Sequence, residues 1–409
     1  MKHLIIGNGI AGINAARAIR EMDTTAGIFM VSDETFPPYS RPMISYVLEG
    51  SEPHEKLPLF AGNVYEDLNI TPVLGHRVAH LDVKKKFVHL ENGTDIDFQK
   101  LLIASGADAR HIRVPGADLG NIFTMRTQKD VLDHLAAISL GVKNALVLGG
   151  GLVGFKAAHA LLKRGIKVTM LITSAYPLAM QVDPTAGRMI LKELQAHGLS
   201  VKVGVSVSSF DGDTRVKKAS LDSGETLDCD LVIVGKGVDP SLGFIPENDI
   251  EIDYGILVDP YLCSSVPDIY AAGDAAESMD IARQKRWVNA IWPEAAIQGR
   301  IAGYNMAGRK VACPGSLGRN VMRIFGLDVM TVGLANPDGA DDLEIIQAGG
   351  EKAGVYRSLV FCRDILVGAV LVNQIEQGGI LRAMIENRIP VRIPKAYLMS
   401  LHFDYSKLL

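Results

Sequence analysis

The chain begins with short apolar runs that are separated by glycine-rich or polar turns. Residues 2–6 form an apolar run that is long enough for one buried strand and too short for a helix. Residues 13–22 carry Ala and Ile at helical spacing, and residues 27–31 form a second apolar run. The pattern therefore predicts a strand, a helix and a second strand, with a glycine turn after the first strand.

That glycine turn, GNGIAG at residues 7–12, suits a dinucleotide site. Gly7 permits a sharp turn, Gly9 lets a pyrophosphate approach the backbone, and Gly12 lets the helix pack against the strand. The helix N-terminus offers N–H groups to the phosphates. An acid about 20 residues further on binds ribose hydroxyls in such sites, and Glu34 or Asp33 falls there. A glycine turn used only for packing is the alternative.

The same pattern occurs a second time. Residues 144–148 predict a buried strand, residues 149–154 (GGGLVG) repeat the glycine turn, and residues 155–164 and 167–172 predict the helix and strand that follow. Two such units in one chain seldom serve two copies of one ligand. We therefore expect one tightly held cofactor and one exchangeable cofactor.

The remaining pattern predicts further strands and helices. We expect strands broken by turns over 73–105, an amphipathic helix over 185–197, strands over 201–207, 217–221 and 231–234, and a strand over 268–272 that runs into Gly273-Asp274 with a helix soon after. The last part of the chain predicts strand-like segments over 319–332, 358–361 and 365–372 and a helix over 379–387. This tail, residues 316–409, is expected to be a compact α+β part without a glycine turn of its own. Its last stretch, 392–397 and Leu408-Leu409, fits docking of a partner and self-packing equally.

Length and charge narrow the functional classes. A chain of 409 residues should hold two or three domains. The net charge of −4 gives no reason to expect nucleic acid or an anionic membrane as a partner. The basic run Lys84-Lys85-Lys86 suits a solvated hairpin tip better than a binding patch. No apolar stretch of about 18 residues predicts a membrane span, and the first apolar run belongs to a strand, so we expect a cytoplasmic protein.

The cysteines argue against a thiol mechanism. Cys229, Cys263, Cys313 and Cys362 are single and far apart, which suits neither a zinc site nor a closely spaced redox disulfide. The ten histidines form no metal-ligand pattern, so we expect no metal site.

These landmarks together resemble the FAD-dependent pyridine-nucleotide oxidoreductases that carry two dinucleotide-binding domains. The nearest group comprises rubredoxin reductases, oxygenase-type ferredoxin reductases and the flavin part of NADH-dependent nitrite reductases. The segments that carry the resemblance are IIGNGIAG (5–12), PPYSRPMIS (37–45), LLIASGA (101–107), GGGLVG (149–154) and IYAAGD (269–274). It implies an α/β fold with a discontinuous FAD domain (1–112 and 241–314), an NAD(P)H domain (113–240) and a C-terminal α+β interface domain (315–409).

The resemblance also assigns cofactor residues. Those expected to hold FAD are Gly7, Gly9, Ile10, Ala11, Gly12, Asp33, Glu34, Arg41, Pro42, Ser45, Val78, Ala104, Ser105, Gly106, Gly273, Asp274, Trp292 and Pro293. Those expected to hold the nicotinamide dinucleotide are Gly149, Gly151, Leu152, Val153, Gly154, Thr173 and Gly237. The helix that opens at Trp292 would present its N-terminus to the flavin pyrimidine, where reduction places negative charge. Core packing is the alternative role for Trp292.

Two positions depart from the family pattern. Ferredoxin reductases of this group often have Lys after the serine of the RPxxS segment and Glu after the second glycine turn, whereas this chain has Tyr46 and Lys156. We hypothesise that the positive charge has moved from the position of Tyr46 to that of Lys156, so that Lys156 lies near the contact between flavin and nicotinamide. A solvent-facing helix lysine is the alternative. Relatives with a redox cysteine soon after the first unit are excluded, because residues 1–228 contain no cysteine.

The second unit lacks a ribose acid. Its second strand ends in Thr173-Ser174-Ala175-Tyr176, with no carboxylate before Asp183 and no Arg or Lys to hold a 2′-phosphate. This favours NAD(H) over NADP(H) as the exchangeable substrate. It also fits weak nucleotide binding, or a domain that has lost this function.

The expected reaction is hydride transfer between nicotinamide and flavin, in which the cofactors carry the chemistry and no side chain need act as nucleophile or base. We predict an NADH-linked flavoenzyme that exchanges electrons with an iron–sulfur or rubredoxin-type protein. That partner is either a free carrier or a subunit of a larger redox complex such as an aldehyde oxidoreductase. The alternatives are a flavin-bearing interaction or sensor subunit with little turnover, and a reductase for a small quinone-type acceptor.

Overall fold

The computed structural model describes residues 1–337, 342–400, 403, 404 and 406, so Leu408-Leu409 lie outside the described residues. The chain divides into two compact units, each assembled from separate stretches of sequence. Unit 1 comprises Met1–Pro42, Glu55–Asp108 and Asp239–Gly318, and unit 2 comprises Met43–His54, Ala109–Val238 and Arg319–Leu409. Unit 2 thus groups the residues predicted for the NAD(P)H and C-terminal domains and adds residues 43–54. The three-domain division remains a prediction.

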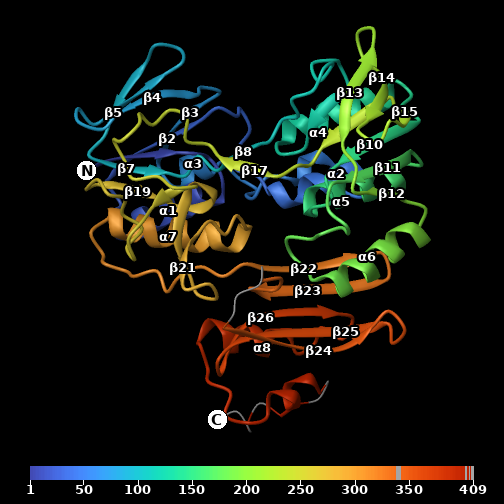
Figure 1. The fold of residues 1–409 in the computed structure, drawn as a ribbon. Helices are drawn as coiled ribbons and strands as arrows, with labels where there is room; N and C mark the ends of the chain where they lie inside the picture. The colour runs from blue at the N-terminus through green and yellow to red at the C-terminus, as the bar shows by residue number, and fades with distance from the viewer. Residues whose placement is uncertain (338–341, 401–402, 405, 407–409) are drawn as a thin grey trace. The chain divides into compact units, whose positions relative to one another are not determined.

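Unit 1 is built on a five-stranded parallel sheet (Figure 1). Its strands lie in the order β19-β7-β1-β2-β3, so the first strand of the chain is central. Helix-covered parallel strands are buried on both faces, which explains why they read as unbroken apolar runs. The bounds are β1 (Lys2–Ile6), β2 (Gly27–Ser32), β3 (Ile70–Leu74), β7 (Lys100–Ile103) and β19 (Ile269–Ala271).

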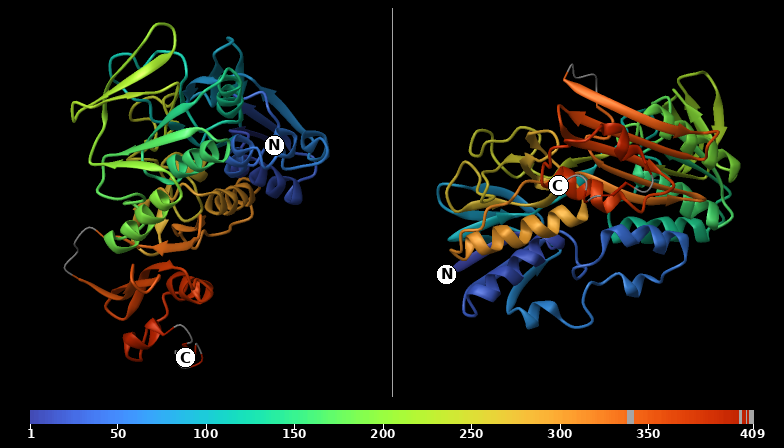
Figure 2. Two further views of the ribbon diagram at one scale, coloured as in Figure 1. Left: turned by 90° about the vertical axis from the view of Figure 1, so that its right-hand side faces the viewer. Right: turned by 90° about the horizontal axis from the view of Figure 1, so that it is seen from below.

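Two helices pack together beside this sheet, α1 (Ile10–Met22) and α7 (Trp292–Met306) (Figures 1 and 2). Small residues let their backbones touch. A Cβ atom on Gly299 would lie 2.1 Å from the Ala11 carbonyl oxygen, and one on Gly303 would lie 2.4 Å from that of Ala15. This contact fixes α7, which comes late in the sequence, against the helix of the first glycine turn.

Smaller elements complete unit 1. An antiparallel sheet is formed by β4 (Val78–Asp82), β5 (Phe87–Leu90) and β6 (Asp95–Asp97), with Lys84-Lys85-Lys86 in the turn between β4 and β5, as predicted. A second three-stranded sheet has β18 (Ile256–Leu257), β20 (Ala276–Asp280) and β21 (Lys285–Trp287). The short helices are α3 (Val64–Asp67) and η3 (Gly273–Ala275). Four further elements lie where the chain passes between units, namely η1 (Arg41–Met43), η2 (His54–Lys56), β8 (Ala107–Ala109) and β17 (Val238–Pro240).

Unit 2 repeats the parallel architecture. Its five strands lie in the order β12-β11-β10-β16-β9. Their bounds are β9 (Ile122–Thr124), β10 (Asn144–Leu148), β11 (Lys167–Ile172), β12 (Ser200–Val203) and β16 (Leu231–Val234), with helices α2 (Ile44–Glu49), α4 (Gln128–Ser139), α5 (Leu152–Lys163) and α6 (Pro184–Ala196). An antiparallel sheet of β13 (Val207–Gly212), β14 (Val216–Leu221) and β15 (Thr226–Asp228) follows β12 in the chain.

The C-terminal part of unit 2 is a five-stranded antiparallel sheet with one α-helix among its described residues. The sheet order is β22-β23-β26-β25-β24. The bounds are β22 (Arg319–Ile324), β23 (Leu327–Gly333), β24 (Leu343–Gly350), β25 (Val355–Cys362) and β26 (Ile365–Val372), followed by α8 (Gly378–Glu386) and η4 (Lys395–Met399). The mixed α/β fold that was predicted is confirmed, parallel sheets and C-terminal α+β part included.

Specific contacts hold this sheet to the rest of unit 2 and to its own last segment. The Tyr356 hydroxyl donates to the Asp183 carboxylate at 2.7 Å, and the same carboxylate caps α6 by accepting from Thr185 N. The buried Arg357 guanidinium donates to the carbonyls of Leu398 and Ser400. The described part of the last segment therefore folds back onto its own sheet.

Two local predictions were wrong. Residues 201–207 do not form one strand, because the chain bends at Gly204 (φ +70°) and divides into β12 and β13, which belong to different sheets. No α-helix follows soon after Asp274. Strand β20 comes instead, because the chain pairs in parallel with β18 and antiparallel with β21. The buried Glu277 carboxylate of β20 also accepts from the backbone N–H groups of Tyr254 and Gly255. The helix begins only at Trp292.

Candidate cofactor sites

The first glycine turn has the geometry that a phosphate cradle requires. Gly7 has φ +112°, and a Cβ atom on Gly12 would lie 2.1 Å from the Gly7 carbonyl oxygen, so both glycines are required by the fold itself. Gly9 differs, since nothing lies within 4 Å of its Cβ position. No side chain caps the N-terminus of α1 at Gly9. Its N–H groups therefore fit an anionic ligand.

An ion pair lies beside this turn, within unit 1. The Glu34 carboxylate accepts from the Tyr39 hydroxyl at 2.7 Å and from the Arg41 guanidinium. A small pocket here is lined by Asn8, Gly9, Ser32, Glu34, Phe36, Tyr39 and Arg41. The predicted acid thus faces the glycine turn, whereas Asp33, the alternative acid, is exposed. Glu34 and Arg41 thus both line the pocket beside the first glycine turn.

Asp274 belongs to the same cluster. Burial opposes the charge on Arg41, but Tyr39, Glu34 and Asp274 together raise the pKa of its guanidinium. A Cβ atom on Gly273 would lie 3.4 Å from the Ala11 side chain, so the Gly273-Asp274 segment touches α1. The fold therefore brings together segments that lie more than 200 residues apart in the chain. The residues present fit a flavin dinucleotide with its pyrophosphate at the N-terminus of α1.

The other predicted flavin residues occupy several environments. The Ala104 carbonyl packs against Gly7, the Ser105 hydroxyl donates to the Ser241 carbonyl, and Gly106 has φ +74°. Val78 is buried in the core of unit 1. At the start of α7, Trp292 is half-buried and Pro293 is exposed. Ile10 is the first residue of α1, and Pro42 is exposed. Ser45 is buried on α2 in unit 2.

Five residues of this site were not predicted, namely Asn8, Ser32, Phe36, Tyr39 and Gln298. Tyr39 lies within the PPYSRPMIS segment, and an aromatic hydroxyl five residues after the acid was the available signal. Gln298 is buried on α7, where its Oε1 accepts from Gly273 N at 2.8 Å and its Nε2 donates to the Ser278 hydroxyl. A Gln on the buried face of a helix is a weak signal by itself.

Unit 2 contains the second cradle. Gly149 has φ +111°, a Cβ atom on Gly154 would lie 2.0 Å from the Gly149 carbonyl oxygen, and nothing lies within 4 Å of the Cβ position of Gly151. Helix α5 has no side-chain cap at Gly151. Gly149, Gly151 and Gly154 therefore correspond to the three glycines of the first turn in conformation and close contacts, and this second turn fits a second dinucleotide. Leu152 and Val153 open α5 beside it, with Val153 exposed.

The ribose end of this second site is neutral. Thr173 is exposed directly after β11, and the Ser174 hydroxyl donates to the Tyr176 carbonyl. The loop then bonds back to the glycine turn through Leu178 N and the Gly150 carbonyl, 2.8 Å apart. Gly237, after β16, is exposed with φ +96°.

Lys156 and Tyr46 are neighbours within unit 2. The Lys156 ammonium lies 5.7 Å from the centre of the Tyr46 ring, a cation–π distance. Burial lowers the pKa of Lys156. The pair is held by the packing of α2 on α5, in which the Arg164 guanidinium donates to the carbonyls of Val47 and Leu48. Lys156 therefore sits in a partly desolvated position, unlike an ordinary surface lysine.

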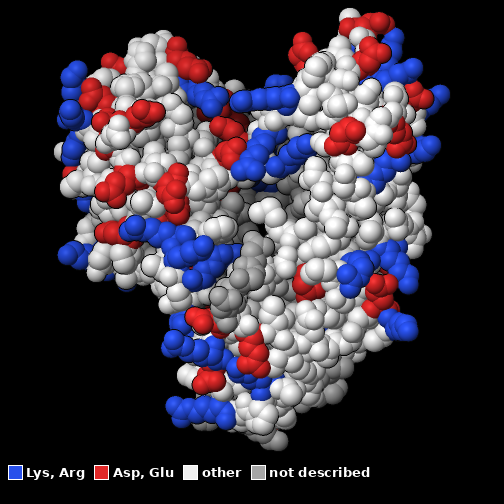
Figure 3. Space-filling view, viewed as in Figure 1, with Lys and Arg blue, Asp and Glu red and all other residues white. Residues whose placement is uncertain are grey.

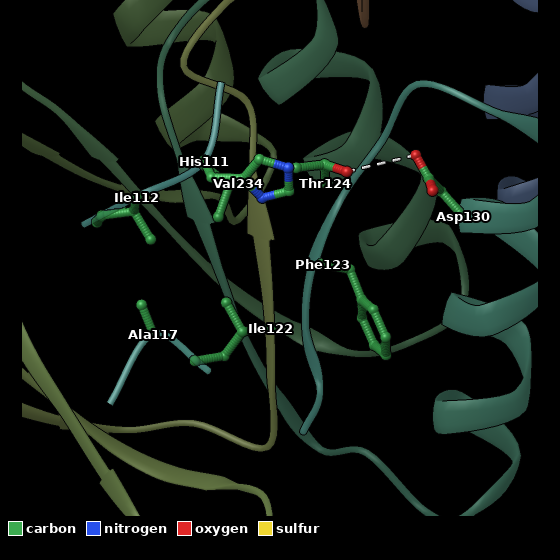
Figure 4. A pocket seen from close by; sticks show the side chains of 8 residues that line it. All are labelled: His111, Ile112, Ala117, Ile122, Phe123, Thr124, Asp130 and Val234. Atoms are coloured by element: carbon green, nitrogen blue, oxygen red, sulfur yellow. Dashed lines mark hydrogen bonds between the residues drawn. The ribbon is translucent and has the colours of Figure 1, made fainter. Parts of the chain in front are cut away.

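A separate cavity of about 210 Å³ lies at the carboxyl ends of β9 and β16 in unit 2 (Figure 4). Its lining is apolar apart from three side chains, and the Thr124 hydroxyl donates to the Asp130 carboxylate at 3.4 Å. The lining residues are His111, Ile112, Ala117, Ile122, Phe123, Thr124, Asp130 and Val234. None of them was predicted to bind a cofactor.

The cysteines carry no disulfide. All four are free thiols, and burial raises the pKa of Cys229 to about 12 and also raises the pKa of Cys263 and Cys313. Within the described ranges, no cluster of three His, Cys, Asp or Glu side chains is arranged to bind a metal ion. None of the helices there is long and apolar enough to span a bilayer.

Comparison with known proteins decides the family. The model of the pyridine nucleotide-disulphide oxidoreductase family matches residues 1–293. The chain belongs to this family. A second model, that of the rubredoxin NAD+ reductase C-terminal domain, matches residues 319–389. The predicted membership and the predicted flavoenzyme class are both confirmed, with FAD and NAD(H) as cofactors.

Particular relatives sharpen the comparison. The chain is 31% identical over 393 residues to the NADH-dependent phenylglyoxylate dehydrogenase subunit epsilon of Aromatoleum evansii, covering 95% of this chain and 92% of that one. It is 33% identical over 278 residues to a rubredoxin-NAD(+) reductase of Pseudomonas putida, covering 68% and 72%. The ferredoxin reductase for the CYP199A2 system of Rhodopseudomonas palustris has the same fold, with TM-score 0.87, 24% identity and 99% coverage of both chains.

Proposed function

We propose that this protein passes electrons between NAD(H) and a one-electron carrier protein of the iron–sulfur or rubredoxin type, with FAD as the resident cofactor. The observation that carries the proposal is the cluster in unit 1 where the uncapped start of α1 lies beside the Glu34–Arg41 ion pair and the Gly273-Asp274 segment. Bound FAD supplies the capacity to accept a hydride and to release the two electrons singly. The absence of any disulfide among the four cysteines supports an acceptor outside the chain.

Each part of the first site has a role in this proposal. The α1 N–H groups and Arg41 bind the pyrophosphate, and Glu34 orients the adenosine ribose. Asp274, held by the Gln298–Gly273 hydrogen bond, accepts from hydroxyls of the ribityl chain. The start of α7 at Trp292 and Pro293 has no side-chain cap and would present its positive end to the flavin pyrimidine. Val78 and the Ala104–Gly106 segment, which also belong to unit 1, would contact the FAD as predicted.

The second site binds the nicotinamide dinucleotide at the start of α5. Gly151 leaves room for its pyrophosphate, and the neutral Thr173 end favours NADH without a strong ribose contact. Lys156, on the same helix and partly desolvated, would lie near the contact of flavin and nicotinamide, where its ammonium would stabilise the negative charge that the flavin gains. We also propose that the chain works within a larger redox complex, because a relative that aligns along nearly its whole length is a dehydrogenase subunit.

Anaerobic reduction followed by steady-state turnover tests the proposal. We expect NADH to bleach the flavin band and a rubredoxin or [2Fe–2S] ferredoxin to restore it, at turnover near the enzymatic median of about 10 per second. Bleaching without turnover on any carrier or one-electron dye would contradict it and support a sensor subunit. Turnover with quinones but with no protein carrier would support a small-molecule reductase instead.

A further inference from the structure

The β20–β21 hairpin of unit 1 presents an aromatic and basic surface. Ser278 lies opposite Trp287 in its register, and Met279 lies opposite Arg286. Met279 is 50% exposed and Trp287 is 39% exposed. Large apolar side chains that are this exposed on a short hairpin contribute little to folding stability. Trp, Met and Arg are among the side chains enriched at protein interfaces.

The exposed charged side chains of this hairpin are all basic. Figure 3 shows Lys and Arg side chains gathered in the region of β21. The Arg283 guanidinium lies 4.7 Å and the Lys285 ammonium 5.4 Å from the centre of the Trp287 ring. The two acids of the hairpin, Glu277 and Asp280, are 5% and 0% exposed and are bonded inward. A protein of net charge −4 therefore carries a local cationic surface here.

The base of the hairpin is fixed by buried hydrogen bonds. The Asp280 carboxylate accepts from Arg283 Nη1 at 3.2 Å and from Asn289 Nδ2 at 2.7 Å. The Asn289 side chain also donates to the Ser316 hydroxyl, which accepts from the Ser278 hydroxyl. The Gln298 side chain in turn joins the Ser278 hydroxyl to the Gly273 amide. A surface that is held rigidly in this way loses little conformational entropy when a partner binds.

Both arms of the hairpin lead into the proposed flavin site. Asp274 lies in η3, and β20, which contains Ser278, begins directly after η3 at Ala276. Trp287 precedes Trp292, the first residue of α7, by five residues. The exposed surface is thus connected by short segments to two predicted flavin contacts. By contrast, the described part of the C-terminal segment is bonded to its own sheet through Arg357.

We propose that this hairpin, with Lys285, Arg286 and Trp287 at its surface, is the docking site for an acidic one-electron carrier of the iron–sulfur or rubredoxin type. The inference rests on the proposed function, since only electron exchange requires such a carrier. Positive charge near the flavin accelerates encounter with an acidic protein, and Trp287 supplies the apolar contact that retains it.

The test compares two double charge reversals in the full-length, FAD-loaded protein. K285E/R286E changes the hairpin, and K84E/K85E makes the same change of net charge in the exposed turn between β4 and β5 of the same unit. The probe is a purified acidic rubredoxin. Its dissociation constant is measured by surface plasmon resonance, and NADH-dependent reduction of rubredoxin and of a neutral quinone is measured in parallel. K285Q/R286Q and W287A accompany them in case the reversals disturb folding.

We expect K285E/R286E to weaken rubredoxin binding by at least about tenfold at low salt, and K84E/K85E by less than about twofold. Quinone reduction stays unchanged in both. K285Q/R286Q and W287A give smaller losses of the same kind, and high salt removes the difference between the charge variants. If rubredoxin binding depends on the hairpin charges but NADH does not reduce rubredoxin, the docking site would be supported and the proposed function refuted. Equal binding by both reversals, or no binding by the unaltered protein, would refute the docking site even where turnover persists.

Discussion

Gly9 and Gly12 belong to one motif, yet the structure predicts opposite consequences for adding a methyl group at each. The Gly12 Cβ position lies 2.1 Å from the Gly7 carbonyl oxygen, and ordinary contacts of a Cβ atom begin at 3.4 Å. The backbone of α1 or of the turn must therefore move by about 1 Å to accept Gly12→Ala. Gly9 has φ −84° and ψ −171°, which any residue adopts, and its Cβ position is open.

These distances set the expected magnitudes. Overpacking against backbone costs about 1–3 kcal/mol, so Gly12→Ala should lower the melting temperature of the flavin-free protein by several degrees. Gly9→Ala should leave it unchanged. In Gly9→Ala the new methyl group occupies the phosphate cradle and displaces one charge-assisted hydrogen bond, which contributes about 1.5–3 kcal/mol. FAD affinity should therefore fall by about 10- to 100-fold.

The assay is thermal unfolding of the flavin-free protein together with a fluorescence titration of FAD. Gly151→Ala provides an internal control, because Gly151 is the open glycine of the second turn. It should weaken NADH binding and leave FAD binding unchanged. The reasoning is refuted if Gly9→Ala binds FAD as the unaltered protein does, or if Gly12→Ala is equally stable in the flavin-free form.

Three further predictions concern stability and the second site. Tyr356→Phe removes the hydrogen bond to the buried Asp183 carboxylate and should cost about 1.5–3 kcal/mol of unfolding free energy, measured by urea denaturation. Burial lowers the pKa of His3 and of His134 to about 4 from an ordinary value of 6.5. The unfolded chain therefore takes up protons first, and stability should fall between pH 6.5 and about 4 by up to about 1.4 kcal/mol per pH unit for each histidine. Replacing both with Gln should flatten that slope in urea titrations at several pH values. Lys156→Gln should slow flavin reduction by NADH about tenfold in stopped-flow traces, equivalent to about 1.4 kcal/mol, with little change in NADH affinity; an unchanged rate would make Lys156 structural.

The parallel strands were the most predictable part of this fold. Residues 2–6, 144–148, 167–172 and 231–234 were predicted with the bounds that the structure has, because strands buried on both faces read as unbroken apolar runs. Strand β24 was missed, since it lies at a sheet edge with most of its residues exposed. Its apolar pattern is correspondingly weak.

The cofactor sites were predictable where a local motif fixes the backbone, as at Gly7, Gly12 and Gly149. They were not predictable where long-range packing decides the position of a side chain. Gln298 reaches Gly273 only because Gly299 lets α7 lie on α1. The segment after Asp274 was predicted as a helix, whereas it forms β20 by pairing with β18, about 20 residues earlier in the chain, and with β21.

The central claim is that the first glycine turn, Arg41 and Asp274 together hold one FAD that NADH reduces. The most direct test is the visible spectrum of the purified protein during anaerobic titration with NADH. We predict a yellow protein with one FAD per chain, whose flavin band is bleached by one equivalent of NADH. A colourless protein that cannot be reconstituted with FAD, or a bound flavin that NADH leaves oxidised, would contradict the account.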